Sequence, residues 1–244
     1  MHHSTHVPLA GAFGGGGLFG IGYAMGVLEG LREQGIDLST APMVGTSAGS
    51  WAAAATALGV DFDQLAALDV PRFPNPRSGV LANSARRVFG NAMRANVHVI
   101  ACALPRLLRT ELDGAKLPLS TMVAASSAVP GLLSPQRIEG RWYIDGGVRS
   151  GVSVDLAAPA DLLIVIAPLA GAMFGPFNNL VERNTDREIA AWRKSCSGNV
   201  RLFAPTASTA KIATLPHHLF DKDRAIDAYA HGRQEARGDL VGNN

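Results

Sequence analysis

The amino-acid sequence predicts an α/β protein, a three-layer α/β/α sandwich with a mostly parallel central sheet. Short apolar stretches, typical of buried strands, alternate along the chain with longer segments of helical periodicity. The stretch 162–167 (Leu-Leu-Ile-Val-Ile-Ala) is continuously apolar, as expected for a strand buried on both faces. With 244 residues, 47% of them hydrophobic and 17% charged, the chain can bury a sizeable core and is not of the disordered class. We expect one domain over residues 1–244.

The first part of the chain predicts two strands and two helices. An apolar stretch at 7–13 runs into the glycines at 14–17, and apolar residues at helical spacing follow as far as Gly35. A short strand at 41–44 leads into a tight segment at 45–49 and a helix of small residues ending at Leu58.

The middle of the chain, at about 71–119, is rich in arginine. Prolines punctuate its start, and we predict two helices, at 81–95 and 97–109. Between residues 70 and 110 there is no acidic residue, and the arginines are Arg72, Arg77, Arg86, Arg87, Arg94, Arg106 and Arg109. We interpret this segment as an arginine-rich helical lid or insertion.

The last part predicts further strands and helices. A short helix at 121–128 precedes a strand at 141–144, and further strands are expected at 162–167 and 200–204. Helices are expected at 177–194 and 221–237. This alternation completes the pattern of a sheet with helices on both faces.

Residues 45–49 (Gly-Thr-Ser-Ala-Gly) match the pattern Gly-x-Ser-x-Gly. A serine hydroxyl is a poor nucleophile until a base takes its proton and the backbone exposes it. Gly45 and Gly49 allow a strand to turn sharply into a helix, which leaves Ser47 in strained, exposed backbone. A glycine-rich turn without chemistry is the plainer interpretation, but the strand–turn–helix context favours a nucleophile.

The glycine run is the second motif. Residues 15–20 (Gly-Gly-Gly-Leu-Phe-Gly) open a helix, where backbone N–H groups can point together at a negative oxygen. The same hexapeptide fits the dinucleotide pattern Gly-x-Gly-x-x-Gly, and Asp37 follows it by about twenty residues. That alternative leaves Ser47 without a role.

The third motif is Asp145-Gly146-Gly147, at the end of a predicted strand. An aspartate on a glycine turn can reach a neighbouring loop and act as a general base. Taken alone, the motif favours the plainer interpretation, a turn aspartate that accepts a hydrogen bond from its own backbone.

In this order, the three motifs resemble the patatin-like phospholipase family. The stretch 125–130 (Ala-Ser-Ser-Ala-Val-Pro) is similar to the small-residue helix and proline that the family places before its aspartate. The resemblance covers roughly residues 7–167. It implies a Ser47–Asp145 dyad without histidine and neither a metal nor another cofactor. It also implies an oxyanion hole at Gly15, Gly16 and Gly17, and supporting turns at Gly20, Gly45, Gly49, Gly146 and Gly147.

The sequence departs from the family at Phe19, where the family usually has Arg or Lys. The resemblance then implies a weaker preference for phospholipid phosphate, and it favours a neutral ester, a lysolipid or an acyl thioester. Hydrolysis of a carboxylic ester of a lipid (phospholipid, lysophospholipid or simpler acyl ester) is the predicted function.

Two alternatives stay open. His218 falls late in the chain, as the histidine of a Ser–Asp–His triad of the α/β-hydrolase kind would. A non-catalytic nucleotide- or lipid-binding module built on the glycine loop is the other.

The expected partners are a lipid or acyl-ester substrate and, through the arginines of 72–109, an anionic membrane surface. A solvated basic face is the plainer reading of these arginines. We expect no nucleic-acid partner, because few aromatic residues (Phe73 and Phe89) accompany these arginines. No signal-peptide or membrane-spanning pattern is present, and Cys102 and Cys196 are too few for a disulfide scaffold. We therefore expect a cytoplasmic protein whose contact with membrane is peripheral.

Overall fold

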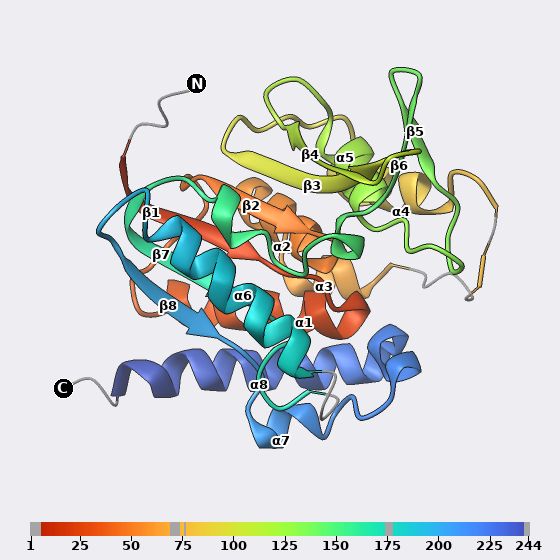
Figure 1. The fold of residues 1–244 in the computed structure, drawn as a ribbon. Coiled ribbons are helices and arrows are strands. Elements are labelled where there is room, and N and C mark those ends of the chain that lie inside the picture. The colour runs from red at the N-terminus through yellow and green to blue at the C-terminus, as the bar shows by residue number, and fades with distance from the viewer. Residues whose placement is uncertain (1–5, 69–73, 76, 174–177, 242–244) are drawn as a thin grey trace.

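The computed structural model describes residues 6–68, 74–75, 77–173 and 178–241 (Figure 1). Its strands are β1 (Val7–Phe13), β2 (Met43–Thr46), β3 (Val97–Ala103), β4 (Leu108–Asp113), β5 (Gln136–Ile138), β6 (Arg141–Asp145), β7 (Ala160–Ile166) and β8 (Asn199–Phe203). Its helices are α1 (Gly17–Arg32), α2 (Ala48–Leu58), α3 (Phe62–Ala66), α4 (Val80–Phe89), α5 (Leu119–Ser126), α6 (Asn178–Trp192), α7 (Ala207–Ala210) and α8 (Lys222–Val241).

All eight strands belong to one sheet, in the order β5-β6-β3-β2-β1-β7-β8, and β4 pairs with β3 outside this path. The central pairs β3–β2, β2–β1, β1–β7 and β7–β8 are parallel. The pairs that β4, β5 and β6 form are antiparallel. The prediction of a mostly parallel sheet is therefore confirmed, with an antiparallel addition at one end.

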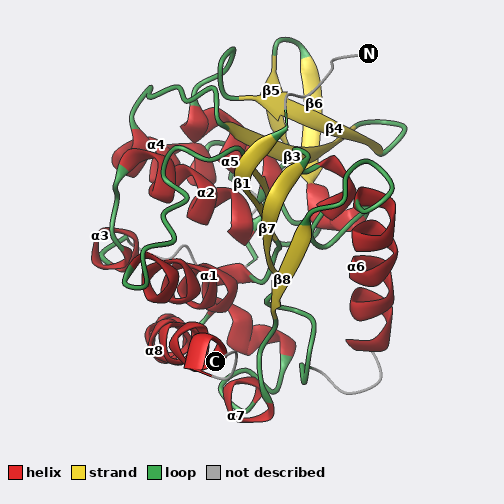
Figure 2. Cartoon of the chain, turned by 90° about the vertical axis from the view of Figure 1, so that its left-hand side faces the viewer, coloured by secondary structure: helices red, strands yellow, loops and turns green. Residues whose placement is uncertain are grey.

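Helices cover both faces of the sheet, as the sequence predicts. Figure 2 shows α1, α2, α4 and α5 on one side of the strands and α6 on the other, with α8 lying outside α1. Two clusters of buried apolar side chains fill the spaces between the layers. Strand β7 contributes to both clusters, since Ile164 and Ile166 point to one and Leu163 and Val165 to the other. This is the physical meaning of its continuous apolar sequence.

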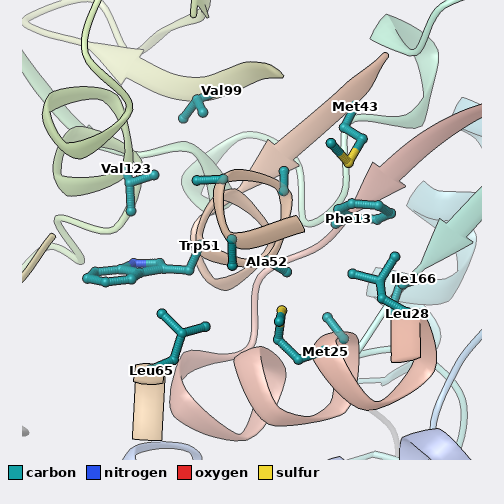
Figure 3. Close-up of a cluster of buried hydrophobic side chains, with 14 of the residues drawn as sticks. Phe13, Met25, Leu28, Met43, Trp51, Ala52, Leu65, Val99, Val123 and Ile166 are labelled. Carbon is teal, nitrogen blue, oxygen red and sulfur yellow. The ribbon is translucent and has the colours of Figure 1, made fainter. Parts of the chain in front are cut away.

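Helix α2 lies in the middle of the larger cluster, between the sheet and α1 (Figure 3). Its small residues, such as Ala52, allow it to pack closely against its neighbours in this cluster. Trp51 is the exception, and its ring points out of α2 toward Leu65 and Val123 (Figure 3). Close packing of this helix matters because its first turn carries Ser47.

Helices α1 and α8 pack along each other at very short distance. Gly22, Gly26 and Gly30 form a row on α1 that faces the backbone of α8. A β-carbon added at Gly26 would lie 2.1 Å from the carbonyl oxygen of Tyr229, and one at Gly22 would lie 2.0 Å from that of Ala225. The two helices can approach this closely because the row has no side chains.

The predicted helix at 97–109 is wrong, because these residues form β3 and the beginning of β4. Val97, Val99 and Ile100 are β-branched and suit a strand. Pairing along both edges of β3 then outweighs the local helical pattern. The helical part of the predicted insertion is α4, which ends at Phe89 and not at residue 95. Arg72 lies outside the described residues.

We predict that Gly26→Ala lowers the melting temperature by several degrees. The new methyl group must push α1 and α8 apart, and overpacking of this kind costs roughly 1–3 kcal/mol. Thermal unfolding measures the change. The matched control is Gly238→Ala on the exposed side of α8, where an added β-carbon meets nothing within 4 Å. This control should keep or raise the melting temperature, and an equal fall in both variants would contradict the packing argument.

Candidate active site

Two strands meet end to end along one edge of β3. Ile100 pairs with Thr46 of β2 on this edge and with Glu111 of β4 on the other. The next residue, Ala101, pairs with Asp145 of β6 and again with β4 on the opposite side. Strands β2 and β6 therefore share an edge and run toward each other. Their last residues bring two motifs that are 98 residues apart in sequence to the same point.

The turn between β2 and α2 holds Ser47 in a strained conformation, with φ 51° and ψ −119°. Positive φ is unfavourable for a residue with a side chain, and such strain is concentrated at functional sites. Both flanking glycines are required by close approach. A β-carbon at Gly45 would lie 2.6 Å from the Cα of Ser50, and one at Gly49 would lie 2.0 Å from the carbonyl oxygen of Phe13. This turn is the sharp strand-to-helix geometry that exposes a nucleophile.

The side chains of Ser47 and Asp145 are in contact. The Ser47 hydroxyl donates to Oδ2 of Asp145 at 2.6 Å, and the Gly147 N–H donates to Oδ1 at 2.7 Å. Both residues are buried. Gly146 lies against β3, where a β-carbon would be 2.3 Å from the carbonyl oxygen of Ile100. The Asp-Gly-Gly turn thus fixes the carboxylate from one side and leaves its other oxygen to the serine.

Burial changes the acidity of this carboxyl group. It raises the pKa of Asp145 to about 6, although the hydrogen bonds from Ser47 and the Gly147 N–H oppose part of the rise. A carboxylate with a raised pKa is a stronger base than an exposed one, and it is still ionised at neutral pH.

Ser126, at the end of α5, closes the gap where β2 and β6 meet. Its hydroxyl donates to the carbonyl oxygen of Ile100 at 2.6 Å and accepts the N–H of Ser47 at 2.7 Å. At this point neither β2 nor β6 offers a partner to these two backbone groups, and the Ser126 hydroxyl takes that place. The sequence pattern at 125–130 does not indicate this role, which only the register of β3 reveals.

The glycine loop between β1 and α1 passes directly over Ser47. A β-carbon at Gly15 would lie 3.3 Å from Cβ of Ser47, and one at Gly20 would lie 3.1 Å from Cβ of Ala48. The Gly15 N–H donates to the carbonyl oxygen of Gly151 at 2.9 Å, so it is engaged and cannot serve an oxyanion as expected. In the described part of the chain no protein acceptor is found for the N–H groups of Gly16 and Gly17.

A turn at residues 150–153 supports both the glycine loop and β2. Besides the Gly151 carbonyl, it offers the Val152 carbonyl to the hydroxyl of Thr46 at 3.4 Å. Glu188 of α6 holds this turn by accepting the Ser150 hydroxyl and the N–H of Val154. Burial raises the pKa of Glu188, and these hydrogen bonds oppose the rise. No sequence motif indicated Glu188, because its partners lie far away in the chain.

An apolar pocket of about 130 Å³ opens beside Ser47. It lies on the face of the sheet that α1 and α2 cover. The residues that line it are Gly17, Leu18, Ile21, Ser47, Ala48, Trp51, Phe62, Leu65, Ala66, Leu68, Leu81, Ser84, Ser127, Val129, Leu133, Phe220, Lys222 and Ala225. Such a pocket suits a hydrocarbon group next to the serine.

The geometry does not favour either a Ser–Asp–His triad or a nucleotide-binding module built on the glycine loop. Among the described residues, no histidine is a hydrogen-bond partner of Ser47 or Asp145; Nδ1 of His218 instead accepts the N–H of Leu215 at 3.3 Å. Asp37, which a dinucleotide site would need, lies beyond the far end of the 16-residue helix α1 and accepts hydrogen bonds from Ser39. Within the same residues, no group of three or more His, Cys, Asp or Glu is arranged to hold a metal ion.

Fold and site together define an α/β protein with a serine–aspartate pair at the carboxyl end of a parallel sheet. The model of the patatin-like phospholipase family matches residues 103–158, which confirms the resemblance inferred from the motifs. The matched stretch contains Asp145 and α5 but neither Ser47 nor the glycine loop.

The fold is also similar to a solved structure. The crystal structure of VipD from Legionella pneumophila matches with a TM-score of 0.50 and 13% identity, over 96% of this chain and 67% of that chain. At this identity the likeness concerns the fold alone. No curated protein matches the sequence. Taken together, the comparisons support lipid acyl hydrolysis in general terms.

We predict that Asp145→Asn raises the melting temperature at pH 8, by about 3 °C or more. The fold keeps a buried charge at this pH, and the neutral amide removes that cost while still accepting the Gly147 N–H. Because the folded pKa of about 6 exceeds the unfolded value of 3.8, protonation stabilises the wild-type fold. That stabilisation is fully present below pH 3.8 and is lost as pH rises through 6.

The difference between variant and wild type should therefore shrink as the pH is lowered from 8 to 4, in melting curves recorded at each pH. Asp186→Asn is the control, because it removes an exposed carboxylate of α6. A constant difference across this range would show that Asp145 titrates as an ordinary carboxylate.

Proposed function

We propose that the protein is a serine hydrolase that cleaves carboxylic esters of lipids through an acyl-enzyme on Ser47, with Asp145 as general base. One observation carries the proposal: the 2.6 Å hydrogen bond from the strained serine to a buried carboxylate, at the wall of an apolar pocket. The family match supports a lipid substrate.

In the acylation step, Oγ of Ser47 bonds to the ester carbonyl carbon while its proton passes to Oδ2 of Asp145. The carbonyl oxygen becomes an oxyanion. When the tetrahedral intermediate collapses, the bond to the alcohol oxygen breaks and Asp145 returns the proton to that oxygen. The alcohol leaves, and the acyl group stays on Ser47 as an ester.

The N–H groups of Gly16 and Gly17 are the proposed oxyanion donors. They lie at the start of α1, where the helix dipole favours negative charge. Each preorganised donor lowers the barrier by about 3 kcal/mol. Gly15 has a different proposed role: its hydrogen bond to Gly151 fixes the loop over Ser47.

Deacylation uses the same groups in reverse. Asp145 takes a proton from a water molecule as its oxygen attacks the acyl carbon. Collapse of the second intermediate releases the carboxylic acid and returns the proton to Oγ of Ser47. No histidine is needed, because the raised pKa of Asp145 already suits it to accept and return a proton near neutral pH.

The pocket supports a substrate with one acyl chain in the site. Its volume of about 130 Å³ is near that of a cavity of about 150 Å³ that holds a single benzene molecule, so the pocket takes the ester end of one chain and not a whole chain. Phe19 gives the site no charge, because its ring is fully buried and stacked on Tyr23. A lysophospholipid or a simpler acyl ester fits these walls better than a lipid that places two chains in the pocket.

We also propose peripheral contact with an anionic membrane surface through the arginines of 72–109. Arg77, Arg86, Arg87, Arg94 and Arg106 are exposed. Each basic residue near such a surface contributes about 1 kcal/mol. Arg109 takes no part in this, because it is paired with Asp155. No helix in the described part of the chain has the length and apolar character needed to cross a bilayer.

Labelling with a fluorophosphonate probe tests the nucleophile. Wild type and His218→Ala should be labelled, Ser47→Ala should not, and Asp145→Asn should react at least about a hundredfold more slowly because general-base catalysis is worth that much. Labelling is read from the mass of the intact protein, after thermal melting has shown that each variant is folded. Loss of labelling in His218→Ala would replace the dyad with a triad, and an unlabelled wild type would sink the hydrolase proposal.

The pH dependence of kcat/KM tests the base. Asp145 must be ionised to accept a proton, so kcat/KM for a soluble p-nitrophenyl ester should rise tenfold per pH unit below about 6 and level off above it. The residual activity of Asp145→Asn should lack this rise. If the wild-type profile stays flat between pH 5 and 8, the base is not Asp145.

A further inference from the structure

The apolar pocket beside Ser47 contains one charged group. Among the described residues that line it, Lys222 alone is ionised, and the other polar side chains in the wall are Ser47, Ser84 and Ser127. Lys222 is the first residue of α8, and its side chain is exposed. The pocket therefore combines a hydrocarbon wall with a single cation that solvent can reach.

The acidic neighbours of Lys222 face elsewhere. Asp221 and Asp223 line a separate, open hollow together with Arg224, and neither lines the pocket at Ser47. Asp221 accepts the N–H of Arg224 at 3.1 Å, which caps the start of α8. The Arg224 side chain donates to the carbonyl oxygen of Ile212. Lys222 is therefore the one of these four charged residues that lines the pocket at Ser47.

No acidic residue is among the described residues that line the pocket, and the Asp145 carboxylate lies behind Ser47, to which it is hydrogen-bonded. The first turns of α1 and α2 also line the pocket, at Gly17, Leu18 and Ala48, and helix N-termini favour anions. Low-dielectric walls concentrate the field of a charge inside a cleft. A negative group that enters next to the ester therefore meets an attraction that it would not meet at an ordinary surface lysine.

We propose that Lys222 determines substrate specificity by binding a negatively charged phosphate group next to the scissile ester. This rests on the proposed function and narrows it to single-chain acyl esters with an anionic headgroup. The acyl chain lies against the apolar wall, the ester carbonyl faces Ser47, and the phosphate pairs with the ammonium group. The charge that Phe19 does not supply in α1 is thus supplied from α8.

The test compares esters that share one acyl chain and differ in headgroup. Lysophosphatidylglycerol and lysophosphatidylcholine both carry the negatively charged phosphate, which a choline cation offsets in the second, and monoacylglycerol carries no phosphate; each is used below its critical micelle concentration. Wild type should prefer both phosphate esters to monoacylglycerol, and lysophosphatidylglycerol most of all because no choline cation offsets its phosphate. Lys222→Gln should raise KM for the anionic ester roughly tenfold, as loss of one charge-assisted hydrogen bond predicts, and should change kcat little. For monoacylglycerol, both constants should stay within about twofold.

Two further variants sharpen the result. Lys222→Glu should raise KM for the anionic ester more than Lys222→Gln does. Lys222→Arg should return this KM to near the wild-type value. Lys194→Gln is the matched control, because it makes the same change in net charge at an exposed position after α6, on the other side of the sheet. It should leave KM and kcat for all three esters unchanged.

Failure of the inference differs from failure of the proposed function. If all three esters are hydrolysed with equal kcat/KM, or if Lys194→Gln acts as strongly as Lys222→Gln, the role of Lys222 is wrong and the hydrolase proposal stands. If wild type hydrolyses none of them and also resists the fluorophosphonate probe, the proposed function itself has failed.

Discussion

The site depends on the way β2 and β6 meet along one edge of β3. Parallel β2 ends at Thr46, antiparallel β6 ends at Asp145, and β3 pairs with both in consecutive residues. Because β3 holds both strands by its hydrogen bonds, this register sets the separation of Ser47 and Asp145. Where the two strands leave a gap, the Ser126 hydroxyl supplies the missing hydrogen bonds.

The same arrangement stores two kinds of unfavourable energy. Ser47 has positive φ, and Asp145 is a buried carboxylate with a raised pKa. Both persist because the surroundings leave no room for relaxation: the glycine turns are closely packed, and α2 is held between the sheet and α1. Stability lost in this way gives a nucleophile that faces the pocket and a more basic carboxylate, which an acyl transfer requires. Support extends beyond the contact residues, since Glu188 of α6 holds the turn that anchors the glycine loop.

Sequence patterns failed where pairing partners, and not local preference, decided the structure. Residues 97–109 have apolar positions that fit a helix as well as a strand, and periodicity cannot separate the two in so short a segment. In the fold, β3 is paired on both edges, which a helix here would forbid. The prediction for Gly15 failed for a related reason. Its N–H donates to the carbonyl oxygen of Gly151, which lies in a turn far away in the sequence.

The sequence by itself determined the α/β class, the order of most elements and the three motifs, because these depend on local periodicity and on backbone conformations that glycine permits. It named Ser47 and Asp145 but gave no distance between them. Tertiary structure alone decided that they touch, that Ser126 and Glu188 support them, and that Lys222 from the last helix lies in the wall of the same pocket. These relations join residues far apart in the chain, and only the strand register and the packing of α8 on α1 bring them together.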